Sequence, residues 1–372
     1  MRISIYCHSI APSIDGVCRR FTGILEELCK QGHEIQLFTL EEVPEELPAA
    51  IKRENIITLP YFFMPAYPDK KVAKPTFVAM YHIYSNLRRF RPEVIHVTAD
   101  GIAQMFALGG LLVQVPVVGS FHTDILDLVK SRNANWFQKG VILFKEFVDC
   151  RVMNSCATTS KSFSRKLAVQ GAKIDHIIQT AVNSEVFHPS KINKDLRSEL
   201  TFGHPDAFLC VYVGRISKEK KLDVIVDALK DIDDAYLAII GDGPEGATFA
   251  ARHSKHHRIY CKPRFLNHHE LAEVYASSDI HVSASEFETL GNTVLEAFSC
   301  SIPVVVPRTQ GFCDTVDHEV DGFLFNPADS QDAARYILQL RNDKKLRQKM
   351  GSAGQKTCEN RTIEVSTRRL PL

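Results

Sequence analysis

Short apolar runs alternate with segments of helical periodicity along most of this chain, and the whole alternation occurs twice. Alternating strands and helices are typical of a parallel sheet with helices on both faces. Strands are expected at residues 3–7, 34–40, 94–97, 115–120, 156–159 and 177–178, and again at 208–213, 235–240, 258–261, 280–283, 303–306 and 322–325. Helices are expected at residues 17–31, 101–113, 137–153, 160–170, 222–229 and 290–299, after Pro244 and Asn267, and twice between 329 and 358.

The alternation is interrupted once, between residues 187 and 207, where two prolines and mixed charges replace the periodic pattern. A chain of 372 residues has room for about two domains, each with its own core. We therefore predict the α/β class, with two Rossmann-like domains at residues 1–190 and 191–372, and we interpret 187–207 as the linker. In such an architecture the ligand site lies in the cleft at the carboxyl ends of the strands.

Charge and cysteine usage exclude several function classes. The 45 Lys and Arg residues nearly balance the 44 Asp and Glu residues, so a net charge of +1 does not attract nucleic acid. The ten cysteines form no C-x-x-C pair, which argues against a zinc ribbon or a thioredoxin-type site. We interpret them as small buried residues of a protein in a reducing compartment.

The sequence predicts neither a signal peptide nor a transmembrane segment. The first strand follows Met1 and Arg2 directly, which leaves no room for a secretory signal. The most membrane-like stretch, residues 101–119, contains Gln104 and Pro116 and divides into a helix and a strand. We therefore expect a cytoplasmic protein that is either free or peripheral on a membrane surface.

The stretch 61–92 combines eight aromatic residues with two basic clusters, at 70–74 and 88–91. One interpretation is a surface that meets anionic lipid or a lipid acceptor. The other interpretation is a packed helix with a solvated basic face. The sequence leaves both open.

Three motifs suggest ligands that we consider weaker candidates. Residues 241–246 match the dinucleotide-binding pattern G-x-G-x-x-G, but no Asp or Glu follows between 247 and 269 to bind a ribose. The D-x-D sequence at Asp231 and Asp233 could hold a divalent metal, yet a solvated helix end explains it as well. Five histidines between 253 and 269 have irregular spacing, and we interpret them as surface residues.

A glycine and two cations follow the strand expected at 208–213. Gly214 allows a ligand to approach the backbone closely. Arg215 and Lys220 place two positive charges before the N-terminus of the next helix, and this combination binds anions. A second glycine turn, with Gly241 and Gly243, follows the neighbouring strand.

Two carboxylates, separated by seven residues, follow the strand expected at 280–283. Glu288 precedes a helix, and Glu296 lies two turns into it, where its carboxylate can accept two hydroxyl hydrogen bonds. The backbone amides around Leu290 and Gly291 have no partner within the helix and are available to a ligand. A pair of glutamates alone is weak evidence, but three such segments, each after a strand, indicate one anion- and hydroxyl-binding site.

In these segments the chain resembles family 4 of the retaining glycosyltransferases, which have the GT-B fold of two Rossmann-like domains facing each other across a cleft. In the first half the resemblance is looser: Gly16 matches the glycine loop after the first strand, and His122 matches the cleft histidine of the family. In the second half it is carried by residues 214–220, 241–244, 288–297, 303–305, 311 and 322–324.

The resemblance implies a role for each matching residue. Arg215 and Lys220 would neutralise the diphosphate of a nucleotide sugar, Glu296 would hold the ribose hydroxyls, and Glu288 would face the transferred sugar. The catalytic residues are then expected to be His122, Arg215, Lys220 and Glu288. The donor-binding residues are expected to be Gly16, Gly214, Arg215, Lys220, Gly241, Gly243, Arg264, Phe265, Glu288, Leu290, Gly291, Asn292 and Glu296. Fixed cations and amides stabilise the leaving diphosphate, so no metal and no cofactor beyond the nucleotide sugar are expected.

The segment 285–291 looks like that of the sulfoquinovosyltransferases of plants and cyanobacteria, which glycosylate diacylglycerol from a UDP-sugar. This implies transfer of a hexose-type sugar, with retention, from a UDP-sugar to a lipid or glycan acceptor. Asp15 and Gln310 depart from the family, since relatives often have glycine there. A GDP-mannose-dependent mannosyltransferase, a catalytically silent sugar- or lipid-binding relative, and a nucleotide-dependent epimerase or dehydrogenase remain alternatives. The family's last helix returns to the first domain, and here we expect it to be short.

Overall fold

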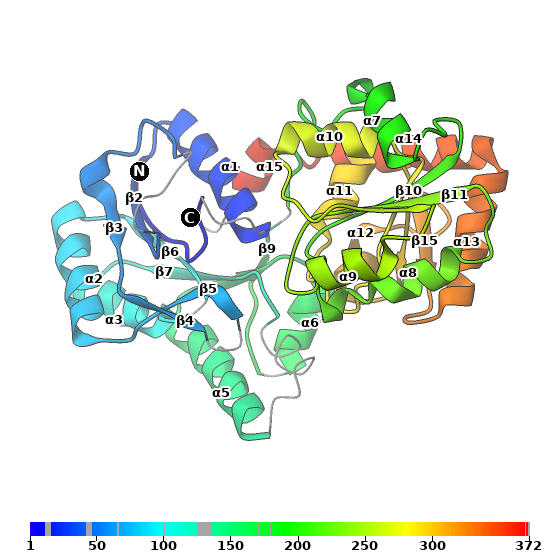
Figure 1. Ribbon diagram of the computed structural model, residues 1–372. Helices are drawn as coiled ribbons and strands as arrows, with labels where there is room; N and C mark the ends of the chain where they lie inside the picture. Colours follow the sequence, from blue (N-terminus) through cyan, green and yellow to red (C-terminus); the bar gives the residue numbers. More distant parts are fainter. Residues whose placement is uncertain are drawn as a thin grey trace. The chain divides into compact units, whose positions relative to one another are not determined.

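The computed structural model divides into two compact units (Figure 1). The first unit comprises Met1–Thr180 with Ile363–Leu372, and the second comprises Ala181–Thr362. The structure describes residues 1–11, 16–41, 47–64, 67–99, 101–124, 136–169, 171–178, 180–368 and 370.

In the described part of the first unit, seven parallel strands form one sheet in the order β3-β2-β1-β6-β7-β8-β9. The strand order reverses at β1, which is the topology of a Rossmann-like sheet. The strands are β1 (Arg2–Tyr6), β2 (Glu34–Thr39), β3 (Ile56–Thr58), β6 (Val94–Thr98), β7 (Val117–Phe121), β8 (Ser155–Thr158) and β9 (His176–Ile177).

The stretch 61–92, which the sequence left open, begins with an antiparallel hairpin and continues as a helix. The hairpin joins β4 (Tyr61–Met64) to β5 (Tyr67–Ala73), and Thr76 caps the following helix by accepting a hydrogen bond from the Ala79 amide at 3.2 Å. The helices of the unit are α1 (Gly16–Lys30), η1 (Arg53–Asn55), α2 (Phe77–Phe90), α3 (Ala103–Val113), α5 (Trp136–Val152), α6 (Lys161–Val169) and α15 (Ile363–Arg368).

The second unit holds a six-stranded parallel sheet in the order β12-β11-β10-β13-β14-β15, the order of a Rossmann fold. Its central strand is apolar throughout and buried on both faces, as a parallel sheet between helices requires. The strands are β10 (Phe208–Val213), β11 (Ala235–Ile240), β12 (Ile259–Cys261), β13 (Ile280–Val282), β14 (Val304–Pro307) and β15 (Gly322–Phe325).

Two hydrophobic cores cover the two faces of this second sheet. Leu209, Val211 and Val213 of β10 point into one core, and the alternate residues Cys210 and Tyr212 point into the other. Helices pack on each face and complete the cores. They are η2 (Pro189–Lys191), α7 (Lys194–Leu200), η3 (Lys218–Lys220), α8 (Leu222–Leu229), α9 (Gly246–His253), α10 (His268–Ala276), α11 (Asn292–Ser299), α12 (Gln310–Thr315), α13 (Ser330–Asn342) and α14 (Lys344–Glu359).

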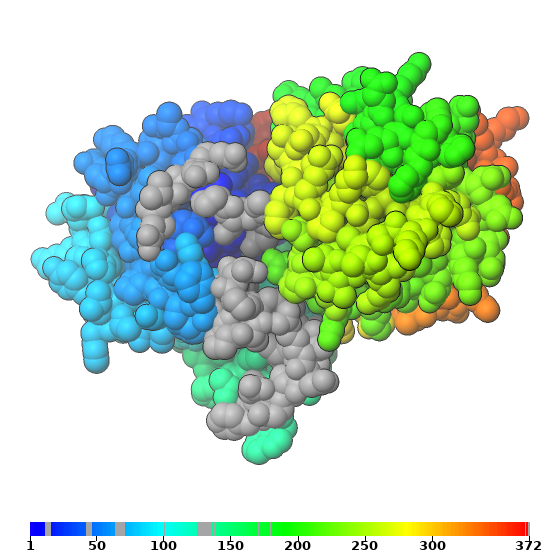
Figure 2. All heavy atoms as spheres, in the orientation of Figure 1, coloured from blue at the N-terminus to red at the C-terminus, as the bar shows by residue number. Residues whose placement is uncertain are grey.

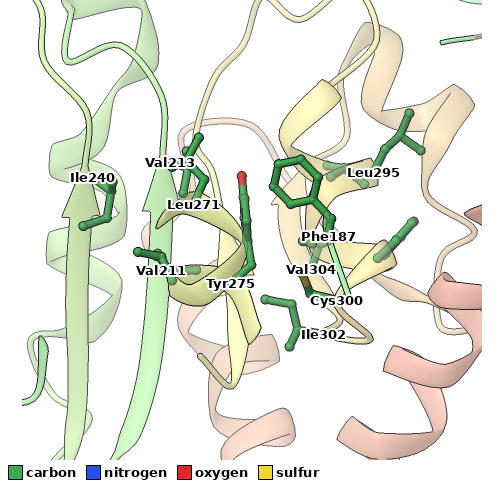
Figure 3. Close-up of a cluster of buried hydrophobic side chains, with 14 of the residues drawn as sticks. Phe187, Val211, Val213, Ile240, Leu271, Tyr275, Leu295, Cys300, Ile302 and Val304 are labelled. Atoms are coloured by element: carbon green, nitrogen blue, oxygen red, sulfur yellow. The ribbon is translucent and has the colours of Figure 1, made fainter. Parts of the chain in front are cut away.

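The prediction that residues 187–207 form a linker is wrong. Phe187 is 3% exposed and lies in the core of the second unit, against Tyr275 (Figure 3). The segment also contains α7, where Arg197 donates hydrogen bonds to the carbonyl oxygens of Pro205 and Ala207 and pairs with Asp279. Prolines and charges gave the segment the composition of a linker, although one aromatic ring and one arginine fix it to the domain.

The domain boundary also differs from the predicted 190/191. The second unit begins at Ala181, because Val182 and Phe187 belong to its core. The last described helix belongs to the first unit, where Ile363 of α15 packs on α1 so closely that a Cβ at Gly23 would lie 3.0 Å from its side chain. The chain therefore returns to the first unit at Ile363.

Most predicted strands and helices lie within two residues of the observed ones. The strands at 208–213, 235–240 and 322–325 and the helix at 222–229 have the predicted bounds. The helix predicted from residue 290 begins at Asn292 instead, because Gly291 has a φ of 85° that a helix does not accommodate. No helix among the described residues is long and apolar enough to cross a membrane.

A buried histidine in the second unit makes stability depend on pH. His281 of β13 is fully buried, and burial lowers its pKa to about 4, while its Nδ1 lies 3.1 Å from the Val211 carbonyl oxygen. The folded protein keeps this ring neutral, whereas the unfolded chain takes up a proton below about pH 6.5. The free energy of unfolding therefore falls between about pH 6.5 and pH 4, by about 1.4 kcal/mol per pH unit from this residue.

Urea unfolding of the wild type and of His281→Asn across this pH range measures the contribution. The variant is expected to be less stable at neutral pH and to lose less stability on acidification. Parallel pH profiles of the two proteins would contradict the assignment.

Candidate functional site

Two glycine turns of the second unit are in direct backbone contact. Gly214, after β10, has a φ of 150°, and Gly241, after β11, has a φ of 134°. A Cβ at Gly241 would overlap the carbonyl oxygen of Gly214, and a Cβ at Gly243 would lie 2.5 Å from the Ile216 carbonyl oxygen. These glycines are required by the approach of the two turns. The two turns therefore form one closely packed backbone surface at the carboxyl ends of β10 and β11.

Backbone hydrogen bonds hold these turns to each other and to the segment after β12. Ile216 donates its amide to the Asp242 carbonyl oxygen at 3.0 Å, and the Glu245 amide donates to the Ile216 carbonyl oxygen at 3.1 Å. The Arg264 amide donates to the Gly241 carbonyl oxygen at 3.2 Å. Three predicted segments of the site are thus connected through their main chains.

Lys220 connects these two glycine turns to the loop after β13. Its Nζ lies 3.0 Å from Glu288 Oε2 and 3.3 Å from Ser285 Oγ. Both partners of the ion pair are about a quarter exposed or less, so solvent still reaches them. The next residue, Lys221, has a φ of 46° and pairs with Glu286 of the same loop. The sequence predicted Lys220 and Glu288 at one site, and the structure places them in contact.

The loop that carries Glu288 rests on α12. The Gly311 amide donates to the Glu288 carbonyl oxygen at 2.8 Å, and the Thr315 hydroxyl donates to the Leu290 carbonyl oxygen at 2.7 Å. A Cβ at Gly311 would overlap the backbone of Leu290, so a glycine is needed here. Gln310, one of the two departures from the family, has a φ of 29°; Asp15, the other, lies outside the described residues.

Glu296 lies within helix α11 and is more deeply buried than Glu288. It is 6% exposed on α11, and the Tyr275 hydroxyl donates to its Oε2 at 3.0 Å. Tyr275 is itself fully buried and contacts the rings of Phe187 and His281, which fixes the direction of its hydroxyl (Figure 3). The sequence analysis missed Tyr275. A tyrosine on the apolar face of the 268–276 helix was the available signal, because a buried phenol needs a partner.

Asn292 is the first residue of α11, and its Oδ1 is buried without a hydrogen-bond partner in the described structure. A buried amide oxygen without a partner costs free energy unless a ligand or water supplies a donor. By contrast, Arg215, Arg264 and Phe265 are exposed. The structure therefore brings Lys220 and Glu288 together beside the glycine turns. The two arginines and the phenylalanine face solvent.

Two predicted site residues, Gly16 and His122, belong to the first unit. His122 follows β7 and is buried, with Nδ1 at 2.6 Å from Arg20 Nη1 and Nε2 at 2.7 Å from Ser120 Oγ. Ser120 also lies 2.9 Å from His96 Nε2. The result is a buried polar cluster at the carboxyl ends of β6 and β7.

Burial sets the charge of this cluster. The pKa of His122 is lowered well below its ordinary value, first by burial and then by Arg20, His96 and His8. Burial also lowers the pKa of His96 to about 4 and that of Arg20 to about 10. His122 is therefore neutral at neutral pH, so that Nδ1 accepts a hydrogen bond from Arg20 and Nε2 can donate one. The sequence analysis missed Arg20, although it falls on the buried face of α1 between Val17 and Ile24.

Gly16 is the first residue of α1, and the residues before it lie outside the described part of the chain. Asp231 and Asp233, the weaker metal candidates, are exposed beyond the end of α8. Among the residues that the structure describes, no three His, Cys, Asp or Glu side chains converge as metal ligands do.

Comparison with known families and relatives shows the family of the chain. Residues 14–184 match the model "Glycosyltransferase Family 4", and residues 197–357 match "Glycosyl transferases group 1". The chain is 30% identical to the sulfoquinovosyl transferase of Arabidopsis thaliana over 366 residues, which span 96% of this chain and 70% of that protein. It is 25% identical to the alpha-monoglucosyldiacylglycerol synthase of Acholeplasma laidlawii, across 93% of this chain and 89% of that one.

A third relative has another donor in its name. The GDP-mannose-dependent alpha-mannosyltransferase of Corynebacterium glutamicum is 27% identical, across 91% of this chain and 81% of that one. Solved structures share the fold: sucrose-phosphate synthase of Thermosynechococcus elongatus has a TM-score of 0.78 at 19% identity, covering 99% of this chain and 97% of its own. The HepE protein of Anabaena, crystallised with UDP and glucose, has a TM-score of 0.75 at 17% identity, covering 100% and 98%. The expected GT-B fold of two Rossmann-like domains is confirmed.

The contact between the glycine turns predicts a large cost for a single methyl group. Gly241→Ala would place a Cβ on the Gly214 carbonyl oxygen at a positive φ, so the second unit is expected to lose about 2 kcal/mol or more of stability. Gly140→Ala is the matched control, because Gly140 lies in helix α5 with no atom within 4 Å of an added Cβ. The control should be neutral or slightly stabilising. Thermal unfolding compares the two variants, and equal melting temperatures would contradict the packing described here.

Proposed function

Because the chain belongs to the glycosyltransferases of family 4 and group 1, we propose that it transfers a hexose-type sugar, with retention of configuration, from a UDP-sugar to a glycerolipid acceptor. The observation that carries the proposal is the contact of Lys220 with Glu288 and Ser285 above two interlocked glycine turns. It combines a fixed cation, a carboxylate and a closely approachable backbone in one place.

Lys220 and Arg215 supply the positive charge that a diphosphate leaving group needs. Cleavage of a sugar–phosphate bond develops negative charge on the diphosphate, and fixed donors near it stabilise the transition state. Lys220 forms a partly exposed ion pair with Glu288, so a diphosphate can take over its ammonium group. Arg215 is exposed and able to turn toward the same anion.

The carboxylates have separate tasks in this proposal. Glu296 accepts hydrogen bonds from the ribose hydroxyls, and Tyr275 orients it through the hydroxyl at 3.0 Å. Glu288 faces the transferred sugar, while the amides of Leu290 and Gly291 and the buried Oδ1 of Asn292 are available to the donor. Gly241 and Gly243 let the two turns pack against each other, which positions the backbone that faces the phosphates.

The remaining predicted residues complete the proposal. Arg264 and Phe265, both exposed after β12, flank the base. In the first unit, neutral His122 bonds a hydroxyl of the sugar or of the acceptor, and Gly16 permits a close backbone approach. In this proposal the two glutamates bind hydroxyl groups and the lysine that neutralises the phosphates. We therefore do not assign them as the acid and nucleophile of a glycosidase.

The lipid acceptor is supported by two relatives. One is named a sulfoquinovosyl transferase, and its 30% identity extends over nearly the whole chain. The other is named an alpha-monoglucosyldiacylglycerol synthase. The second candidate function is GDP-mannose-dependent mannosyl transfer, which the 27% identity to the Corynebacterium glutamicum enzyme supports.

Replacement of the central cation tests the proposed diphosphate site. Lys220→Ala is expected to lower kcat by about 100- to 1000-fold, because it removes one fixed donor from the leaving group. Lys218→Ala is the matched control, since Lys218 is an exposed lysine in the same turn. Initial rates with UDP-glucose and UDP-sulfoquinovose on a diacylglycerol acceptor measure the effect, and circular dichroism checks the fold. Normal turnover by a folded Lys220→Ala protein would show that the phosphate site has been assigned wrongly.

Removal of divalent metal tests the proposed charge stabilisation by side chains. The transfer rate is expected to survive treatment with EDTA, because Lys220, Arg215 and the backbone amides take the part that a metal would play. The same assay, with and without added Mn²⁺, gives the answer. A strict requirement for Mn²⁺ would contradict this expectation and would favour Asp231 and Asp233 as metal ligands.

A further inference from the structure

Helix α5 of the first unit has its polarity reversed. Trp136 is 84% exposed and Phe144 is 69% exposed, and with Val141 at 52% they lie on one side of the helix. The acidic residues of the same helix are on the other side, where Glu146 is 5% exposed and Asp149 is fully buried. A helix in water normally shows the opposite arrangement. The exposed side of α5 is therefore suited to an apolar environment.

Helix α3 extends this surface. Leu108, Leu111 and Leu112 are 48%, 75% and 56% exposed, while Gly109 packs against Ile83 of α2 and Gly110 packs against the sheet. Three leucines thus form a stripe that faces away from both neighbours. In Figure 1, α3 lies beside α2 and α5, and the contacts between these helices agree.

Helix α2 adds aromatic side chains and positive charge. Its first turns expose Phe77 at 96% and Tyr81 at 68%, and its last turn exposes Arg88 and Arg89. In Figure 2 the side chains of α2, in cyan, lie on the outer surface of the first unit. Aromatic and basic side chains side by side are characteristic of protein surfaces that bind at the headgroup level of a bilayer.

Helices α2 and α5 present cations, and none of the three helices exposes a carboxylate. The sequences of α2 and α3 contain no Asp or Glu, and the two acidic residues of α5 are both buried. Arg88, Arg89 and Arg151 are exposed on the same helices. Each such cation near an anionic membrane surface contributes about 1 kcal/mol of binding free energy. The charge distribution therefore favours a negatively charged partner.

We propose that the exposed sides of α2, α3 and α5, here called the apolar face, insert into the headgroup region of an anionic lipid bilayer. This inference extends the proposed lipid acceptor, because it names the surface by which the enzyme reaches a substrate that stays in the membrane. The stretch 61–92 is then only one part of the contact, and α3 and α5 carry most of the apolar area.

A lipid surface fits the apolar face better than a second protein does. Its α2 and α5 helices carry exposed cations beside their exposed apolar side chains, whereas the core of a protein interface is depleted of charge. A bilayer interface accepts both kinds of side chain, since the apolar ones enter the acyl boundary and the cations meet lipid phosphates. The 670 Å³ groove between β4 and α2, lined by Phe62, Phe63, Lys74 and His82, lies in the same unit and has the same composition.

The chain has one tryptophan, and it reports on this surface directly. Trp136 begins α5, so its fluorescence monitors the apolar face in the full-length wild-type protein. With vesicles of phosphatidylcholine containing about one third phosphatidylglycerol, the emission should move to shorter wavelength and acrylamide quenching should fall. Binding should weaken as the salt concentration rises and should be weaker still on phosphatidylcholine alone.

Substitutions locate the contact. Leu111→Ser and Phe144→Ser should each lower the vesicle partition coefficient about tenfold, because each removes one large apolar side chain from the bilayer. Ile192→Ser is the matched control, since Ile192 is 60% exposed in the second unit and should leave binding unchanged. Replacing Arg88 or Arg89 by Gln should lower binding about fivefold, the factor that corresponds to about 1 kcal/mol.

Vesicle binding is measured without donor or acceptor. The membrane proposal can therefore fail while the proposed sugar transfer holds, and the proposed sugar transfer can fail while vesicle binding holds. Wild-type binding by Leu111→Ser and Phe144→Ser, or no response of Trp136 to anionic vesicles, would overturn the proposal. Light scattering covers the remaining occupant: a dimer in solution that either substitution dissociates would assign the apolar face to a second copy of the chain.

Discussion

The close contact of the Gly214 and Gly241 turns is the constraint on which the candidate site depends. Because Gly241 and Gly243 carry no Cβ, the main chains after β10 and β11 touch, and hydrogen bonds from Ile216 and Glu245 hold them together. Helix α8 begins at Leu222, two residues after Lys220, whose ammonium group reaches the loop after β13. A rigid backbone thus determines where one flexible cation can bind.

The ion pair of Lys220 with Glu288 gives this arrangement a chemical consequence. A partly exposed pair contributes little to stability, because water competes for both charges. The pair can therefore exchange partners at small cost when an anionic ligand arrives. Glu296 is different: it is buried and held by Tyr275, so its direction is fixed before any ligand binds. One carboxylate can move, and the other is oriented in advance.

The sequence was sufficient for those features that depend on local pattern. Continuous apolar runs such as 208–213 predicted the buried parallel strands, and Asn267 predicted the start of a helix that the structure confirms and that a capping box with Glu270 begins. Lys220 and Glu288 could be placed at one site because each follows a strand of the same sheet. The role of each residue toward a donor stays a prediction.

The features that were missed depend on tertiary contacts. Residues 187–207 have the composition of a linker, yet Phe187 packs into the core and Arg197 is held by carbonyl oxygens distant in sequence. Tyr275 and Arg20 act on Glu296 and His122 across different elements, which no local spacing reveals. The apolar side of α5 was invisible as well, because only burial distinguishes the environment of Trp136 from that of Glu146.

The central claim is that the second unit binds a nucleoside diphosphate through Lys220 and Glu296. Calorimetric titration of the metal-free protein with UDP, GDP, ADP and NAD⁺, repeated on Glu296→Gln and Lys220→Met, tests it most directly. We expect UDP to bind and each substitution to weaken its binding about tenfold or more, since each removes a charge-assisted hydrogen bond. A preference for GDP would replace the UDP-sugar by GDP-mannose as the donor. Binding of NAD⁺ alone, or of no nucleotide, would contradict the account.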